Sequence, residues 1–340
     1  MSDGGINRRD LMRRGGVTIA GASLLGGLAA CGKKGASASG GGGGGGGGLT
    51  DRSKIRIEMP THMIPADPNT AIMQNGADQA AKDLGVSVKF RGPEQFSIPS
   101  VQRIFDAAIA AKPTAIAATM SDPAAFGPKI QQAVKQGIPV VLFNAGLDDF
   151  DRLGALTYVG QTELRAGQEA GKRLKAAGIT SAIVINQAQG LQQLEQRFQG
   201  VKETLGGNVK QVAVDGSNPV AIRNGTASAL RQNPDVGALL TLSPNAAEEA
   251  MRAIKESGKA GKVKLATFDI TPTVLKAIAS KDILFAIDQQ MYLQTYLSAL
   301  TLVTYVQYRL APATAVPTGP RFVDTSNAND ILKLSGEGIH

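Results

Sequence analysis

Short apolar segments alternate with longer amphipathic segments along most of the chain. Uninterrupted or alternating apolar runs predict buried strands, and apolar residues at helical spacing predict helices packed on a sheet. The predicted strands are 54–60, 86–90, 115–120, 138–143, 155–159, 182–185, 209–214, 236–242, 263–268 and 283–287. The predicted helices are 68–84, 101–111, 125–136, 162–177, 194–205, 222–231, 246–257 and 274–279. Strands and helices in strict alternation predict an α/β protein whose parallel sheets carry helices on both faces.

The first predicted helix shows how local signals set the boundaries. Asp67 and Pro68 supply an N-cap and a proline for the first turn, and Gly85 follows the last apolar position as a stop signal. About ten strands exceed what one open sheet comfortably holds, and the alternation breaks near residues 147–154. We therefore expect two doubly wound parallel-sheet lobes joined by a hinge.

Polar residues follow almost every predicted strand. In open α/β sheets, ligands bind beyond the carboxyl ends of the strands. The residues at these ends are mostly neutral donors and acceptors with a few carboxylates, which suits a neutral ligand with many hydroxyl groups. They are His62, Ser121, Asp122, Asn144, Asn186, Gln187, Ser243, Asn245, Asp269, Asp288, Gln289 and Gln290.

Composition excludes several classes of protein. Cys31 is the only cysteine and His62 and His340 are the only histidines, so no internal disulfide, multi-histidine metal site or Cys/His protease can be built. The net charge of +8 is spread along the chain without a basic run, which argues against a nucleic-acid partner. No motif of an enzyme or a cofactor site is present, so we expect a protein without catalysis, metal or cofactor.

The first residues have the features of an export signal. Arg8 and Arg9 precede the weakly apolar segment 15–30, which resembles a twin-arginine signal, and Leu28-Ala29-Ala30-Cys31 resembles a bacterial lipobox. By that resemblance, Cys31 carries a lipid and becomes the first residue. Residues 32–50, which include the run Gly40–Gly48, form a tether with a reach of roughly 25 Å. The glycine run follows no strand and lacks a Lys-Ser/Thr ending, so it is not a phosphate loop.

Four motifs in order resemble the ribose-type (type I) periplasmic sugar-binding proteins of ABC transporters. They are Gly137-Ile138-Pro139-Val140-Val141 before Asn144-Ala145-Gly146; Tyr158-Val159-Gly160-Gln161 before Ala166-Gly167; Thr267-Phe268-Asp269; and Phe285-Ala286-Ile287-Asp288-Gln289-Gln290. The resemblance spans residues 54–329. It implies the type I periplasmic binding protein fold, a small-molecule sugar as ligand, permease subunits as partners, and a monomer held by lipid at the outer face of the cytoplasmic membrane.

The resemblance also assigns ligand-binding roles. It implies that Asn144 bonds the sugar, Arg197 clamps its oxygens, Asp269 accepts from two hydroxyls and Gln289 completes the site. His62 and Ser243 match polar positions after their strands, and Asp122 joins the set as the residue after the third strand. The loop in which the family usually carries two aromatic residues reads Pro68-Asn69-Thr70 in this chain.

Structural roles stay open for the same residues. Asp269 could be a helix N-cap, Arg197 an exposed helical arginine, Asn144 a turn residue and His62 a loop residue. Asp269 and Asp288 could form an acid/base pair in an enzyme, although no other feature supports catalysis. A repressor would need an N-terminal DNA-binding motif in place of the export signal. A nucleoside or furanose-signal ligand, or a sugar sensor acting through a membrane receptor, are the alternatives within the same fold.

The predicted organisation has four parts. Residues 1–30 form the signal peptide and residues 31–53 the lipidated tether. Residues 54–160 and 290–321 form the N-terminal lobe, and residues 161–289 and 322–332 the C-terminal lobe. The chain is expected to cross between the lobes near Gly160, near Gln289 and at 321–324.

Overall fold

The computed structural model describes residues 49–206 and 208–340, which belong to one compact unit of the chain. The predicted export signal at Arg8 and Arg9, the predicted lipid attachment at Cys31 and most of the predicted tether lie outside the described residues. In the described part, no helix is long and apolar enough to cross a membrane.

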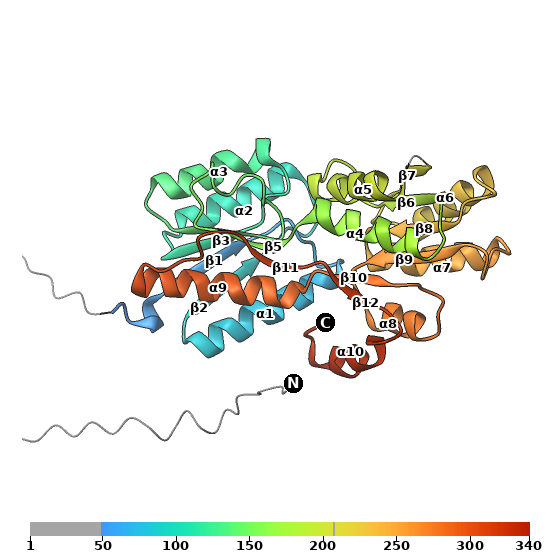
Figure 1. Cartoon of the computed structure of the whole chain (residues 1–340). Coiled ribbons are helices and arrows are strands. Elements are labelled where there is room, and N and C mark those ends of the chain that lie inside the picture. The colour runs from blue at the N-terminus through green and yellow to red at the C-terminus, as the bar shows by residue number, and fades with distance from the viewer. Residues whose placement is uncertain (1–48, 207) are drawn as a thin grey trace, which may run out of the picture. The chain divides into compact units, whose positions relative to one another are not determined.

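Two six-stranded sheets organise the described residues (Figure 1). The first sheet has the order β11-β5-β4-β3-β1-β2 and the second the order β12-β10-β9-β8-β6-β7. We call each sheet with its helices the first and the second lobe. The strands of the first sheet are β1 Arg56–Pro60, β2 Ser87–Arg91, β3 Ala115–Ala118, β4 Val140–Phe143, β5 Tyr158–Gln161 and β11 Val316–Gly319. Those of the second are β6 Ala182–Asn186, β7 Val209–Ala213, β8 Ala238–Thr241, β9 Lys264–Phe268, β10 Ala286–Asp288 and β12 Arg321–Val323.

The predicted doubly wound architecture is confirmed. The first sheet is parallel throughout, and the second is parallel except for its edge strand β12, which runs antiparallel to β10. The two sheets have the same winding, so β1 to β5 of the first lobe correspond to β6 to β10 of the second.

Helices cover both faces of each sheet. In the first lobe, α1 and α9 pack on one face with Val141 and Phe143, while α2 and α3 pack on the other with Val140 and Leu142. In the second lobe, α4 and α5 cover one face, and α6, α7, α8 and α10 cover the other. The helices are α1 Pro68–Leu84, α2 Ile98–Ala110, α3 Pro123–Lys135, α4 Glu163–Ala176, α5 Gln192–Leu205, α6 Pro219–Gln232, α7 Pro244–Glu256, α8 Pro272–Ala279, α9 Met291–Tyr308 and α10 Ala328–Leu334, with short 3₁₀ turns at Arg52–Lys54 and Ser335–Glu337.

The boundaries of α1 follow the predicted signals. The Asp67 side chain accepts from the backbone N–H of Asn69, and Pro68 begins the helix. Gly85 ends it in the left-handed conformation, with φ 66°, which glycine adopts without steric cost. The entry of α1 is therefore fixed, and it places Asn69 in the first turn.

The chain passes between the lobes at three places: after β5, between β10 and α9, and between β11 and β12. The strand predicted at 155–159 lies instead at Tyr158–Gln161, so that prediction was two to three residues early. The cause is β11, which comes from the far end of the chain and pairs with Val159, Gly160 and Gln161. That long-range pairing extends the strand into the crossing and is invisible in the local sequence.

No element was predicted individually after residue 287, yet α9, β11, β12 and α10 all form there. The 18-residue helix α9 buries polar side chains, among them Gln294, Thr295 and Ser298. Burial of polar positions removes the contrast between apolar and polar faces on which a helix prediction rests.

Candidate functional site

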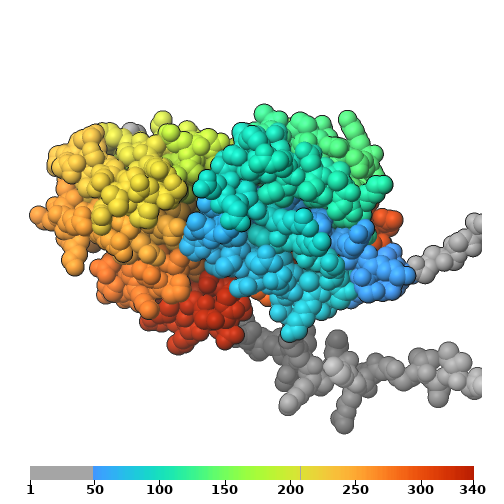
Figure 2. Space-filling model, turned by 180° about the vertical axis from the view of Figure 1, so that it is seen from behind, coloured from blue at the N-terminus to red at the C-terminus, as the bar shows by residue number. Residues whose placement is uncertain are grey.

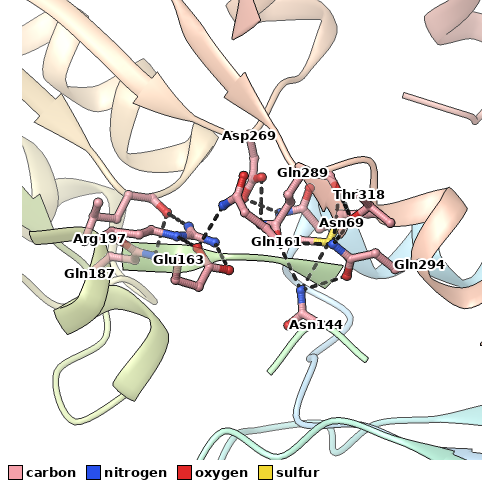
Figure 3. A network of polar contacts seen from close by, with 12 residues as sticks. Asn69, Asn144, Gln161, Glu163, Gln187, Arg197, Asp269, Gln289, Gln294 and Thr318 are labelled. Atoms are coloured by element: carbon pink, nitrogen blue, oxygen red, sulfur yellow. Dashed lines mark hydrogen bonds and ion pairs between the residues drawn. The ribbon is translucent and has the colours of Figure 1, made fainter. Parts of the chain in front are cut away.

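Asn144 and Asp269 follow corresponding strands, β4 and β9. Both adopt the left-handed conformation with φ 63°, and both are 5% exposed. The left-handed region is uncommon for residues with a side chain, although Asn and Asp tolerate it best. This backbone conformation turns the chain sharply at the carboxyl end of each strand, and Gln289 lies between the two side chains and contacts both (Figure 3).

Buried amides connect Asn144 to the passage between the lobes. Asn144 Nδ2 lies 3.2 Å from both Gln289 Oε1 and Gln294 Oε1. Gln294 Nε2 in turn donates to the Gln289 carbonyl oxygen at 2.9 Å and to Thr318 Oγ1 at 3.2 Å. Gln289 therefore lies in a network that includes the end of β4, the start of α9 and β11.

Asp269 accepts hydrogen bonds from two sides. Gln289 Nε2 donates to Asp269 Oδ1 at 2.9 Å, and Asn69 Nδ2, from the first turn of α1, donates to Oδ2 at 3.2 Å. Burial raises the pKa of Asp269 to about 7, and Asp67 and Asp288 add to the rise, while Arg197 and the bond from Gln289 oppose it. A buried carboxylate contacted by amides of both lobes can accept from ligand hydroxyl groups in the same way.

Arg197 forms a buried ion pair with Glu163. Arg197 Nε lies 2.6 Å from Glu163 Oε2 and Nη2 lies 3.2 Å from Oε1, and the guanidinium stands 4.4 Å from the centre of the Phe268 ring. Burial acts to lower the pKa of Arg197, but Glu163 outweighs it and the pKa is raised. Gln161 Nε2 also donates to Glu163 Oε2 at 2.8 Å.

We call the hydrogen-bonded residues around Asn144 and Asp269, together with the Arg197–Glu163 pair beside them, the cluster. The other three predicted site residues, His62, Asp122 and Ser243, make no side-chain hydrogen bond to it among the described residues. Asp122 caps α3 by accepting from the N–H of Ala125 at 2.9 Å, and Ser243 caps α7 by accepting from the N–H of Ala246 at 3.3 Å. His62 is buried after β1, with Nδ1 2.8 Å from Thr119 Oγ1, and burial lowers its pKa to about 4. A ligand role for these three residues stays a prediction.

Two of the structural alternatives are wrong. Thr271, not Asp269, caps α8, because its side chain accepts from the N–H of Val274. Arg197 is 3% exposed and is not a solvated helical arginine.

Sequence reasoning missed Asn69, Glu163 and Gln294 as members of the cluster. Asn69 lay in the stretch noted only for its lack of aromatic residues. Glu163 opens a helix, where an acidic residue is usual on the surface because of the helix dipole. Gln294 lies in α9, which no pattern predicted. Glu163 did carry one signal, since it comes two residues after the end of a strand at the crossing.

The two lobes are in contact around the cluster, and Figure 2 shows them against each other from behind. Gln196 Nε2 on α5 donates to Asp148 Oδ2, in the loop after β4, at 2.6 Å. A cavity of about 20 Å³ lies between this loop and α5, lined by Asn144, Glu163 and Gln193 among others. Within residues 49–206 and 208–340, no group of three or more His, Cys, Asp or Glu side chains could hold a metal ion.

Comparisons with known proteins identify the family and the fold of this chain. The family model described as "Periplasmic binding protein domain" matches residues 63–309. A carbohydrate transporter from Acidothermus cellulolyticus 11B, solved in complex with myo-inositol, is 36% identical, with a TM-score of 0.80 over 84% of this chain and 99% of that one. A periplasmic sugar-binding protein from Legionella pneumophila is 26% identical, with a TM-score of 0.72 over 78% of this chain and 99% of that one.

Among curated proteins, the xylose/arabinose-binding protein XylF of Sulfolobus acidocaldarius is 25% identical over 289 residues, which are 80% of this chain and 72% of that protein. The family match confirms the predicted class, a solute-binding protein and not an enzyme, and the predicted extracytoplasmic place of action. The chain belongs to the periplasmic binding protein domain family.

Proposed function

We propose that this protein captures a neutral monosaccharide or polyol between its two lobes and delivers it to an ABC importer. The observation that supports this most directly is the convergence of Asn144, Gln289 and Asp269 on one buried point. Their amide and carboxylate groups supply the mixed donors and acceptors that hydroxyl groups require. Relatives named for xylose and arabinose, or solved with myo-inositol, support the same class of ligand.

We assign ligand contacts to the seven predicted residues. Asn144 and Gln289 would donate and accept through their amides, Asp269 would accept from two hydroxyls, and Arg197 would donate through the N–H groups outside its pair with Glu163. His62, Asp122 and Ser243 would complete the set from the ends of β1, β3 and β8. Asn69 joins them because it already donates to Asp269.

Closure of the lobes would provide the signal for delivery. The lobes, predicted as 54–160 plus 290–321 and 161–289 plus 322–332, would rotate about the three chain crossings. Gln161 lies in β5 of the first sheet and Arg321 in β12 of the second, so these two bounds each move by one residue. Asn69 on α1 contacts Asp269 of the second lobe, so opening breaks contacts that a ligand then replaces with its hydroxyls. A permease that binds the closed form more tightly would couple ligand binding to docking.

Anchoring at the membrane completes the proposal. Arg8 and Arg9 would direct export, Cys31 would carry a diacylglyceryl group, and residues 31–53 would tether a monomeric binding unit to the outer face of the cytoplasmic membrane. In a membrane fractionation, the wild type is expected in the pellet and Cys31→Ala in the supernatant. A Cys31→Ala protein that stays in the pellet would remove the lipid from the proposal.

The test of ligand binding uses residues 49–340, the described compact unit. A thermal-shift panel of pentoses, hexoses, deoxysugars, polyols and nucleosides should show a stabiliser, because ligand at 1,000 times its Kd adds about 4.1 kcal/mol. Calorimetry should then give one site per chain. Asp269→Ala should weaken binding at least tenfold, and Asp215→Ala, an exposed control, should leave it unchanged. A panel without any stabiliser among sugars and polyols would overturn the proposal.

A further inference from the structure

The pairing of Glu163 with Arg197 is fixed by close contact between two helices. A Cβ atom at Gly167 of α4 would lie 2.1 Å from the Arg197 carbonyl oxygen, and one at Gly200 of α5 would lie 2.2 Å from the Leu164 carbonyl oxygen. Only glycine fits at such an approach of one backbone to another. The side chains of Glu163 and Arg197 are therefore held opposite each other by the packing of α4 on α5.

The pair uses the part of the guanidinium that recognises carboxylates. Nε and Nη2 of arginine form a planar fork that binds the two oxygens of one carboxylate. Here the two oxygens belong to Glu163, at 2.6 Å and 3.2 Å, and both side chains are at most 5% exposed. Gln161 Nε2 also donates to Oε2, at 2.8 Å, so this oxygen accepts from both Gln161 and Arg197. A second carboxylate cannot occupy this edge of Arg197 while Glu163 is present.

The remaining charges near the cluster are negative. The charged groups that act on Asp269 are Arg197, Asp67 and Asp288, and of these only Arg197 is a cation. Arg197 is itself balanced by Glu163 and Asp269. A ligand carboxylate beside Asp269 would thus add a negative charge to a buried setting in which burial already raises the pKa of Asp269 and of Asp67.

We propose that Glu163 determines the charge class of the ligand: by occupying the fork of Arg197, it makes the site accept neutral sugars or polyols and reject sugar acids. This inference rests on the proposed function. Glu163 acts as a positioning residue, because it touches the ligand only through Arg197. Among the described residues, the guanidinium makes one further bond, a long one of 3.4 Å from Nη1 to the Leu242 carbonyl oxygen. One Nη1 hydrogen and one Nη2 hydrogen therefore remain for hydroxyl groups.

The wild-type protein tests the proposal without any substitution. Each uronic acid has a neutral isostere, its uronamide, which has the same ring and nearly the same size. We would measure D-glucuronate against D-glucuronamide, and D-galacturonate against D-galacturonamide, by calorimetry at constant ionic strength, beside the neutral panel. In at least one pair, the amide is expected to bind at least tenfold more tightly than the acid. If neither the acid nor the amide of either pair binds, the acids are rejected because of their size and the proposal is wrong. If the Kd of the acid lies within threefold of that of the amide, the proposal is also wrong.

Glu163→Gln tests whether this residue is the cause. It keeps the volume of the side chain but removes its charge and one of its two acceptor oxygens, so the charge of Arg197 is no longer neutralised by Glu163. The ratio of the Kd of the acid to the Kd of the amide should therefore fall at least tenfold. The double variant Glu163→Gln/Arg197→Met is the control, since it also lacks Glu163 but has no cation at position 197. Its ratio of acid Kd to amide Kd should not fall below that of the wild type. A folded Glu163→Gln protein with an unchanged ratio would exclude Glu163 as the cause, and the wild-type arm decides if the single variant fails to fold. Failure of the proposed function looks different, because then no neutral ligand binds either.

Discussion

Asn144 and Asp269 occupy corresponding positions in the two lobes, with the same backbone conformation and the same burial. One is an amide, and the other is a carboxyl group. The difference extends to their surroundings: the first lobe contributes Asn69, Asn144 and Gln294, all neutral, and the second contributes Glu163, Arg197 and Asp269. One topology has thus produced a half-site of neutral amides and a half-site of charges.

The helix pairs that carry these groups also correspond. In each lobe, the helix after the crossing packs on the helix after the first strand of the sheet, as α4 does on α5 and α9 on α1. Both contacts depend on glycine: Gly167 and Gly200 in the second lobe, and Gly76 in the first, where a Cβ atom would lie 2.3 Å from the Tyr292 carbonyl oxygen. The lobes therefore share the packing of their helix pairs and differ in the polar side chains that those helices and the adjoining strands carry.

Breaking the ion pair should give the largest effect. Arg197→Met leaves Glu163 buried without its partner, and loss of one partner of a buried pair costs about 3–5 kcal/mol of unfolding free energy. The corresponding change in the neutral half-site, Asn144→Ala, removes hydrogen bonds and puts an alanine in the left-handed conformation, but it leaves no charge unpaired, and it should cost about 1–3 kcal/mol. Urea unfolding of both variants measures the difference.

The double variant Glu163→Gln/Arg197→Met provides the control for that experiment. It removes both charges, so most of the stability lost in Arg197→Met should return. If Asn144→Ala costs as much as Arg197→Met, the contrast between a charged and a neutral half-site is wrong.

The sequence predicted the architecture because the signals for it are local. The strand ends that carry Asn144 and Asp269 follow apolar runs, and the Asp67 cap and Gly85 stop define α1 within a few residues. The same signals could not show which side chains meet. Glu163 and Arg197 are 34 residues apart, and only the glycine contacts of α4 with α5 bring them together.

Residues from the end of the chain were the hardest to predict. Gln294 belongs to a helix whose buried polar face hides its periodicity, and Thr318 belongs to β11, which forms only by pairing with β5. Their place in the site depends on contacts across more than a hundred residues, so no local pattern could reveal it. Asn144 and Gln289 were predicted because both lie near the end of a predicted strand and both match ligand-binding positions of the family that the sequence resembles.

The pH dependence of stability should distinguish Asp269 from its counterpart. Its pKa in the folded protein is about 7, above the ordinary 3.8, so the folded state binds the proton more tightly than the unfolded state between these values. The contribution of this proton to the free energy of unfolding is fully present below about pH 4 and is lost as the pH rises to about 7. Asp269→Asn stays neutral, so relative to wild type it should gain stability over this window, by at most about 4 kcal/mol.

Thermal unfolding of wild type and Asp269→Asn at several pH values between 4 and 8 measures this. Glu94→Gln, at an exposed carboxyl group, corrects for the general charge effect. A difference between wild type and Asp269→Asn that stays constant with pH would mean that Asp269 titrates at the same pH folded and unfolded.

The glycine contacts should respond alike in both lobes. Gly167→Ala and Gly76→Ala each drive a methyl group into a backbone oxygen of the partner helix, and overpacking of this kind costs about 1–3 kcal/mol. Gly336→Ala meets nothing within 4 Å and is the control. Calorimetric melting of the three variants tests whether the lobes share their packing, and a neutral Gly76→Ala beside a destabilised Gly167→Ala would show that they do not.

The smallest expected effect concerns the bond from Asn69 to Asp269, which joins the neutral half-site to the charged one. Asn69→Ala removes a single hydrogen bond to a carboxyl group, so ligand affinity should fall about tenfold, or about 1.4 kcal/mol. Asn245 is a matched control because it also follows a proline in the first turn of a helix but is exposed. Calorimetry should show unchanged affinity for Asn245→Ala. Unchanged affinity in Asn69→Ala as well would mean that the ligand does not depend on the bond from Asn69 to Asp269, and that the first lobe contributes through Asn144, which reaches Asp269 only by way of Gln289.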